Sequence, residues 1–378
     1  MVQSELAAWL RLGETPGVGN EHARRLLAAF ATPQAVFDAG ESVLSQVVGS
    51  GIARALHTQP PGFATLLDTT WRWLNEAEPS GGARRIVTLG DADYPAGLLA
   101  MVDPPLMLYL LGRPLPGPDV GCIAMVGSRK PTPQGRLDAL AFGRRFAENG
   151  LTVVSGLAQG IDGAAHEGAL DGAVAANPCT TVAFVGTGLD RVYPARHRAL
   201  AHRIAAGGCL ASEYSLGTPP LPNNFPRRNR LIAGLSLGTL VVEAAQPSGS
   251  LITARLASEQ GKEVFAIPGS IHSEQSRGCH ALIRQGAKLV ESVQDVLEEL
   301  RLPVALSSTH VDEVDGGGGC GGEDSLLEAM GHAPVNVDAL VARTGIDAAT
   351  LQVRLLELEL DGRVGRLTGG LLQRISAG

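Results

Sequence analysis

The chain has 378 residues, 44% of them hydrophobic, and a formal net charge of −7, so it is long enough for two or three domains with a sizeable core. The acidic balance excludes a broad basic coat for nucleic acid but allows a local basic pocket. Five scattered cysteines without a Cys-x-x-Cys pair indicate a reducing compartment and no structural metal. With no apolar run of about 18 residues and no signal-peptide pattern, we expect a cytoplasmic protein without a membrane segment.

Residues 1–80 have the pattern of a helical domain. The stretch from Leu12 to Asn20 contains Gly-Val-Gly and is followed by an apolar-periodic segment that ends at Phe30. It resembles a helix-hairpin-helix, or SAM-like, unit, in which a Gly-x-Gly turn presents backbone N–H groups to a DNA phosphate. A small helical domain whose glycine turn only connects two helices fits equally well, so both interpretations stay open.

The next part of the chain, residues 84–302, has the pattern of an α/β fold with a doubly wound, mostly parallel sheet. Short apolar runs alternate there with helix-like segments, and their nearly continuous apolar character suits strands covered on both faces. The runs are 122–126, 151–154, 181–185, 209–212, 239–242 and 264–267. Two earlier runs, 85–89 and 106–111, are also predicted strands, and we expect the second at the edge of the sheet.

The turns that follow these runs are the predicted site, because ligands bind beyond the carboxyl ends of the strands in such sheets. The turns begin at Gly127, Ser155, Gly186 and Gln246 and are rich in Gly and Ser. Such loops let backbone N–H groups approach a phosphate, and a helix that begins just after adds the positive end of its dipole. The first turn is not Gly-x-Gly-x-x-Gly, and no acidic residue ends the second run, so a dinucleotide cofactor is not expected.

An arginine cluster lies at the start of a predicted helix, where cations oppose the helix dipole. Arg227, Arg228 and Arg230 fall within four residues. A packing role would not require them, whereas arginine offers planar, bidentate donors for phosphate. We therefore expect a phosphate-bearing ligand, with Phe225 as a candidate for base stacking or for a core contact.

The carboxylates and the histidine near these turns form a poor catalytic constellation. Asp162 is expected to cap a helix and His166 to be a buried, hydrogen-bonded side chain. Glu243 ends one strand and is the carboxylate best placed for acid–base chemistry, but it has no partner histidine, nucleophile or metal cluster. We therefore expect no catalytic residues and no metal.

The C-terminal part begins after an acidic, Gly-rich segment, residues 303–323, which is predicted to be a flexible linker. Residues 324–378 then give three helical segments and a hairpin, the outline of a winged helix. From residue 323 onward the chain has eight acidic residues and five arginines. The expected recognition helix carries Glu357 and Glu359, which would repel phosphate, so a protein-contact or tethering role is favoured over DNA reading.

Together these motifs resemble the DNA-processing protein A family, also called DprA or Smf. The matching motifs are Gly127-Ser-Arg129, Ser155-Gly-x-Ala-x-Gly-Ile-Asp162, Gly188-Leu-Asp190 with Tyr193-Pro194, Phe225-Pro-x-Arg-Asn-Arg230, Ser248-Gly-Ser-Leu-Ile-Thr253 and Phe265-Ala-Ile-Pro-Gly269. They occur in consistent order between about residues 85 and 300. The resemblance implies an extended Rossmann-like domain with optional helical and winged-helix domains on either side.

The resemblance also implies a binding protein rather than an enzyme. Members bind and protect incoming single-stranded DNA in natural transformation, load the RecA recombinase, promote strand annealing and form homodimers, without a cofactor. The DNA-binding residues that it implies here are Gly127, Ser128, Arg129, Lys130, Ser155, Gly156, Gly160, Arg196, Arg227, Arg228, Asn229, Arg230, Ser248, Gly249, Ser250 and Thr253. Some relatives have a lysine where this chain has Ala195, and Arg196 or Arg198 is expected to supply that charge. His280 and Ile283 fall in the family's dimer region.

The competing class is an enzyme. Rossmann-like phosphoribohydrolases of the lysine decarboxylase-like family also have Gly-rich turns after the strands, with a Gly-Gly-x-Gly-Thr-x-x-Glu motif that holds phosphate and a catalytic carboxylate. At the comparable turn this chain reads Ser248-Gly-Ser-Leu-Ile-Thr253, and the glutamate is missing. That absence favours single-strand binding over nucleotide hydrolysis.

Overall fold

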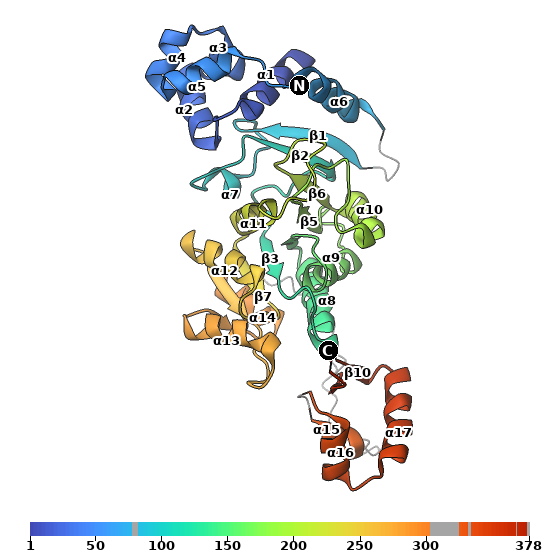
Figure 1. The fold of residues 1–378 in the computed structure, drawn as a ribbon. Helices are drawn as coiled ribbons and strands as arrows, with labels where there is room; N and C mark the ends of the chain where they lie inside the picture. The colour runs from blue at the N-terminus through green and yellow to red at the C-terminus, as the bar shows by residue number, and fades with distance from the viewer. Residues whose placement is uncertain (78–81, 303–324, 332–333, 368, 376–378) are drawn as a thin grey trace.

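The computed structural model describes residues 1–77, 82–302, 325–331, 334–367 and 369–375, so the linker predicted over 303–323 lies outside the described residues. Figure 1 shows helices at the N-terminal end, a central sheet with helices on both faces, and a small C-terminal unit. None of the described helices is both long and apolar enough to cross a membrane. Four described cysteines, Cys122, Cys179, Cys209 and Cys279, are buried and unpaired.

The N-terminal part packs its helices around an apolar core and against the sheet. Its helices are α1 (Gln3–Glu14), α2 (Asn20–Phe30), α3 (Pro33–Asp38), α4 (Glu41–Val48), α5 (Ser50–His57) and α6 (Phe63–Asn75). Trp9 of α1 and Trp73 of α6 lie in one apolar cluster with Tyr109 of the sheet. The rings of Trp73 and Tyr109 meet edge to face with centroids 6.0 Å apart. These contacts fix the helical part to one end of the sheet.

The central sheet has the strand order β1-β2-β6-β5-β4-β3-β7-β8-β9 in the described residues. The strands are β1 (Ala83–Thr88), β2 (Met107–Gly112), β3 (Cys122–Val126), β4 (Thr152–Ser155), β5 (Thr181–Phe184), β6 (Cys209–Ser212), β7 (Gly238–Val241), β8 (Glu263–Ala266) and β9 (Lys288–Leu289). Strands β3 to β9 run parallel to one another. Strand β2 pairs antiparallel with β6 on one side and with β1 on the other. The predicted α/β fold is confirmed. The expected edge position of 106–111 is wrong, because β1 pairs with the outer side of β2.

Helices cover both faces of the sheet. Successive residues of each strand point to opposite sides, and the strand residues on both sides are apolar and need cover. In β3, Ala124 and Val126 lie in one core, whereas Ile123 and Met125 lie in the other. The first core includes α7 (Ala96–Leu99), α11 (Asn224–Leu235), α12 (Gly249–Glu259) and α13 (Arg277–Arg284). The other face is covered by α8 (Pro133–Glu148), α9 (Ile161–Asp171), α10 (Arg198–Gly207) and α14 (Val293–Glu299).

Helices α8 and α9 begin at the same edge of the sheet and pack unusually closely. A Cβ on Gly168 would lie 2.0 Å from the carbonyl oxygen of Leu140, so only glycine allows this approach. Helix α8 is capped by Thr132, whose hydroxyl accepts from the N–H of Gly135 at 3.0 Å. The close pair places the turns before both helices side by side.

The C-terminal unit is a winged helix, as the sequence predicted. It contains α15 (Ser325–Met330), α16 (Val337–Thr344), α17 (Ala348–Leu360) and the antiparallel pair β10 (Val364–Arg366) and β11 (Leu372–Arg374). Leu340, Leu355 and Leu372 lie in its apolar core. The wing lies against the start of α8, where a Cβ on Gly365 would come within 2.7 Å of Pro133.

Candidate nucleic-acid interface

The predicted turns converge where the order of the sheet reverses. β3 lies between β4 and β7, and the chain leaves β3 toward β4 on one side and returns to β7 on the other. All three strands are parallel, so their carboxyl ends meet at one edge. This is the topological switch point at which open α/β sheets bind ligands.

The turn after β3 presents two cations to solvent. Gly127 has no room for a side chain, since a Cβ would lie 2.6 Å from Ile161. The N–H of Ser128 donates to the carbonyl of Glu243 at 2.7 Å, and the Ser128 hydroxyl accepts from the N–H of Lys130 at 3.1 Å. The turn is therefore fixed to the end of β7. Arg129 and Lys130 are exposed, and neither side chain has a hydrogen-bond or ion-pair partner among the described residues.

The turn after β4 supports the first turn. The buried hydroxyl of Ser155 donates to the carbonyl of Met125 at 2.6 Å. Gly160 lies so close to the turn after β3 that a Cβ on it would come within 2.3 Å of the Ser128 carbonyl oxygen. The carboxylate of Asp162 accepts from the N–H groups of Gly156 and Ala158 at 3.1 and 3.3 Å. Asp162 thus stabilises the loop before its helix, and burial raises its pKa although the charge of Arg228 opposes the shift.

Arg228 does not face solvent. Its side chain is 4% exposed, and its guanidinium donates to the carbonyl of Gly156 at 2.6 Å and to that of Phe184. Burial lowers its pKa to about 10, while Asp162 opposes that shift. In this structure Arg228 is therefore out of reach of an outside ligand, which argues against the expected DNA contact; the cation holds α11 to the ends of β4 and β5.

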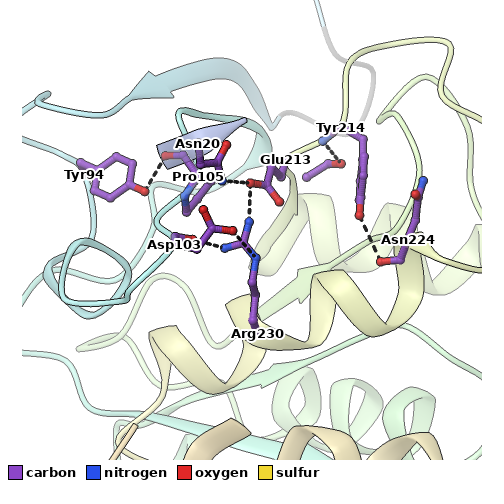
Figure 2. Close-up of polar contacts among 9 residues, drawn as sticks. Asn20, Tyr94, Asp103, Pro105, Glu213, Tyr214, Asn224 and Arg230 are labelled. Atoms are coloured by element: carbon purple, nitrogen blue, oxygen red, sulfur yellow. Dashed lines mark hydrogen bonds and ion pairs between the residues drawn. The ribbon is translucent and has the colours of Figure 1, made fainter. Parts of the chain in front are cut away.

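Arg230 is also used inside the protein, as Figure 2 shows. It donates to the backbone carbonyl of Asp103 at 2.6 Å and forms an ion pair with Glu213, whose side chain is only 10% exposed. Asn20 of α2 donates to the same carboxylate at 3.1 Å. These internal contacts argue against the DNA-binding role expected for Arg230. Asn20, which follows the glycine turn of the N-terminal part, is thereby joined to the end of β6, whereas Gly17 and Gly19 of that turn are exposed.

The remaining residues at the start of α11 stay near the surface. Arg227 is exposed and has no partner among the described side chains. The Asn229 amide donates to the carbonyl of Gly249 at 3.3 Å, which connects α11 to the first turn of α12. Phe225 packs over Gly186, where a Cβ would lie 3.1 Å from the ring. Its ring centroid is 5.5 Å from that of Tyr193, which is 48% exposed.

The turn before α12 is shaped by its hydroxyl groups. Ser248 caps the helix, accepting from the N–H of Ser250 at 3.3 Å, and the two hydroxyls lie 2.7 Å apart. Gly249 is exposed, whereas Ser250 and Thr253 are buried. Ser248 and Gly249 are therefore the members of this turn that an outside ligand can reach.

A cleft of about 930 Å³ opens beside the first turn. It brings together Arg129, Lys130, Gly160 and Arg196, which lies in the short turn η1 (Ala195–His197). The lining contains six cations, Arg129, Lys130, Arg136, Arg196, Arg343 and Arg366, against two acids, Glu167 and Glu274. This concentrated positive charge in an acidic chain is what an anionic polymer requires.

Several residues of the cleft were not anticipated from the sequence. Arg136 follows Pro133 by one helical turn, so the predicted start of α8 could have indicated it; it pairs with Glu167 at 3.0 Å. Arg343 and Arg366 come from the winged helix and give no sequence signal of proximity. Arg227, Asn229 and Ser248 do not line this cleft, so the expected residues fall into two groups along the edge.

Glu243 and His166 have structural partners. The Glu243 carboxylate accepts from the Thr132 hydroxyl at 2.6 Å and from its N–H at 2.9 Å. Burial raises the Glu243 pKa, and the hydrogen bonds from Thr132 oppose the shift. His166 is fully buried, as expected, and its Nδ1 lies 2.6 Å from the Thr181 hydroxyl. Within the described residues no group of three or more His, Cys, Asp or Glu side chains could hold a metal ion.

The two residues expected at a dimer interface lie on α13 and do not line the cleft. His280 and Ile283 are both half-buried, and His280 Nε2 lies 3.0 Å from the carbonyl of Gly269. The helix lies on the β7, β8 and β9 side of the sheet (Figure 1).

Comparison with known proteins gives consistent matches over the central and C-terminal parts. Residues 85–301 match the family model of DNA recombination-mediator protein A, and residues 321–370 match that of the DprA winged helix domain. Protein Smf of Escherichia coli is 42% identical over 292 residues, covering 74% of this chain and 75% of that protein. DNA processing protein DprA of Streptococcus pneumoniae is 47% identical over 209 residues, covering 55% of this chain and 72% of that protein.

Two solved structures resemble the chain in fold and sequence. The X-ray structure of DprA from Streptococcus pneumoniae aligns with a TM-score of 0.60 and 35% identity, covering 79% of this chain and 98% of that one. A structure of DNA processing protein A from Helicobacter pylori, described for its single-stranded DNA binding mode, aligns with a TM-score of 0.50 and 30% identity. It covers 57% of this chain and 96% of that one.

Proposed function

The chain belongs to the DNA recombination-mediator protein A family, and we infer from this that it binds single-stranded DNA and acts as a recombination mediator. The observation that carries the proposal is the cluster of Arg129, Lys130 and Arg196 in one cleft at the carboxyl edge of the sheet. Exposed cations on fixed turns suit a phosphate backbone, which they grip without reading base sequence.

We propose two groups of DNA contacts along this edge. The first is the cleft group, Arg129, Lys130 and Arg196. The second is Arg227 with the exposed part of the α12 turn, Ser248 and Gly249. Gly127, Ser128, Ser155, Gly156, Gly160, Asn229, Ser250 and Thr253 shape the turns that carry these donors.

The aromatic pair Tyr193 and Phe225 favours a single strand over a duplex. Tyr193 is half exposed and packs against Phe225, and both lie close in sequence to the proposed cations Arg196 and Arg227. Unstacked bases can pack on such rings, and base–aromatic stacking contributes about 1–3 kcal/mol per base. A duplex keeps its bases stacked inside and gains nothing from the rings.

We propose that the finer activities of the family follow from this binding. The chain would protect incoming DNA during natural transformation, load RecA and promote annealing, as a homodimer formed through the face of α13 with His280 and Ile283. A dimer would present two clefts to one strand and thereby raise its effective affinity.

Fluorescence anisotropy of a labelled oligo-dT, alone and annealed to oligo-dA, tests the binding proposal. We expect tight binding of the single strand and weaker binding of the duplex. Equal affinities would contradict the proposal. RecA loading is tested separately, by the rate at which RecA forms filaments on a strand coated with single-strand-binding protein, with and without the chain. If the chain binds the single strand but does not speed up RecA filament formation, the RecA-loading part of the proposal is wrong and the binding part stands.

A further inference from the structure

The winged helix carries an apolar surface that its own core does not use. One side of α17 is buried in the core through Leu351, Leu355 and Leu358. The other side exposes large apolar side chains: Val353 is 60% exposed, Leu356 51% and Leu360 81%. Figure 1 shows α17 at the outer side of the unit, with α15 and α16 on its other side. The exposed side chains therefore face away from the unit to which they belong.

The exposed side chains have the spacing of a helix-packing seam. Ala349, Val353, Leu356 and Leu360, here called the α17 stripe, are separated by four, three and four residues, and Ala349 is also exposed. This 4-3-4 spacing is the pattern with which one helix packs along another. A stripe of this width fits the apolar side of one amphipathic partner helix.

Charge around the stripe selects the kind of partner. Residues 347–361 contain four acids and one arginine, and one of these acids, Glu359, forms an ion pair with Arg366 of the wing. Glu357 and Asp361 are exposed beside the stripe. In winged-helix DNA readers this helix faces the major groove, but acids and apolar side chains give phosphate no favourable contact. A second copy of α17 would place the same acids opposite one another, which is unfavourable.

We propose that the α17 stripe docks an amphipathic helix of a partner protein whose apolar side is flanked by Lys and Arg. The stripe gives the affinity through apolar burial, and Glu357 and Asp361 beside it select a basic partner and its orientation. This role is separate from single-strand binding, because the α17 stripe does not line the basic cleft.

Photo-crosslinking in the host cell identifies what covers the stripe. The full chain carries p-benzoylphenylalanine in place of Leu356, with the exposed Ala342 of α16 as the matched control position. We expect a crosslink from position 356 but not from 342. Its mapped site should lie in a protein segment with helical apolar periodicity and flanking Lys or Arg. A crosslink to a second copy, a crosslink to nucleic acid, or none at all would overturn the proposal.

Binding of the mapped segment, synthesised as a peptide, provides the quantitative test. The Leu356→Ser/Leu360→Ser double variant of the full chain should bind it at least about tenfold more weakly, because two apolar contacts are lost. Gln352→Ser, an exposed change on the same helix outside the stripe, should bind like wild type. Unchanged single-strand binding would show that the variants are folded. Equal peptide binding by the double variant and wild type would refute the docking site.

Discussion

The guanidinium of Arg228 lies against Gly156, so closely that a Cβ on Gly156 would come within 2.6 Å of it. Arg228 also donates to the carbonyl oxygens of Gly156 and Phe184, which end β4 and β5. A cation of the arginine cluster thus holds the start of α11 to the sheet. Arg227, its neighbour in the chain, is left exposed to solvent.

Gly156→Ala should destabilise the protein, because the new methyl group must displace a buried, hydrogen-bonded guanidinium. Overpacking of this kind costs roughly 1–3 kcal/mol, which urea unfolding of the purified chain would measure. Gly249→Ala is the matched control, since a Cβ there has no neighbour within 4 Å. Equal unfolding midpoints for the two variants would show that the packing around Arg228 is looser than described.

Arg230→Met should lower stability by about 3–5 kcal/mol, because it leaves the buried Glu213 carboxylate without its cation. Changing both partners, Arg230→Met with Glu213→Leu, removes the uncompensated charge and should recover much of the loss. Thermal and urea unfolding of the wild type, both single variants and the double variant give the coupling energy. Additive losses would mean that the pair contributes no coupling between α11 and the end of β6.

Glu243→Gln should leave single-strand binding within about twofold of wild type and cost about 1 kcal/mol of stability, through one weakened hydrogen bond to Thr132. Neither protein should release a free base from nucleoside monophosphates, since this carboxylate is held by Thr132, the residue that caps α8. Chromatography of the reaction mixture checks the second point. Hydrolysis by wild type that disappears in the variant would establish the hydrolase alternative.

His166 should make the protein less stable in mild acid. Burial lowers its pKa to about 3, with His197 and Arg228 adding in the same direction, whereas an unfolded histidine titrates near 6.5. Below pH 6.5 the unfolded state therefore binds the extra proton, and stability falls as the pH falls. From pH 7.5 to 5.5 this contribution is about 1.4 kcal/mol.

His166→Gln isolates that contribution. The amide can keep a hydrogen bond to Thr181 but does not titrate, so the difference in unfolding free energy between wild type and variant should change by about 1.4 kcal/mol between pH 7.5 and 5.5. Urea unfolding at both pH values measures it. A difference that is independent of pH would mean that His166 is protonated or exposed in the folded protein.

The strands could be predicted because local pattern determines them. Every strand from β3 to β8 begins within one residue of an apolar run, since buried parallel strands need continuous apolar residues. The edge of the sheet that carries the candidate site could also be predicted, because the carboxyl ends of parallel strands lie at the same edge. The position of residues 106–111 in the sheet could not be predicted, because the pairing of β2 between β1 and β6 depends on long-range contacts.

The sequence could not show which of the clustered arginines are buried with partners inside the protein and which is exposed. Arg227, Arg228 and Arg230 are near neighbours in the chain but lie on different sides of one helix. Arg228 meets a carbonyl of β5 and Arg230 meets Glu213 and Asp103, all distant in sequence or set by the loop conformation. The contribution of Arg343 and Arg366 to the cleft could not be predicted for the same reason, because it depends on contacts between residues that are distant in sequence.

The most direct test of the account is a salt titration of single-strand binding by wild type and Arg129→Ala. Each phosphate contact on a single strand contributes roughly 0.7 to the slope of log affinity against log salt. Arg129→Ala should therefore bind more weakly and lose about that much slope. Arg144→Ala, at the far end of α8, should behave like wild type. An unchanged slope and affinity in Arg129→Ala would contradict the proposed cleft and move the DNA site elsewhere on the chain.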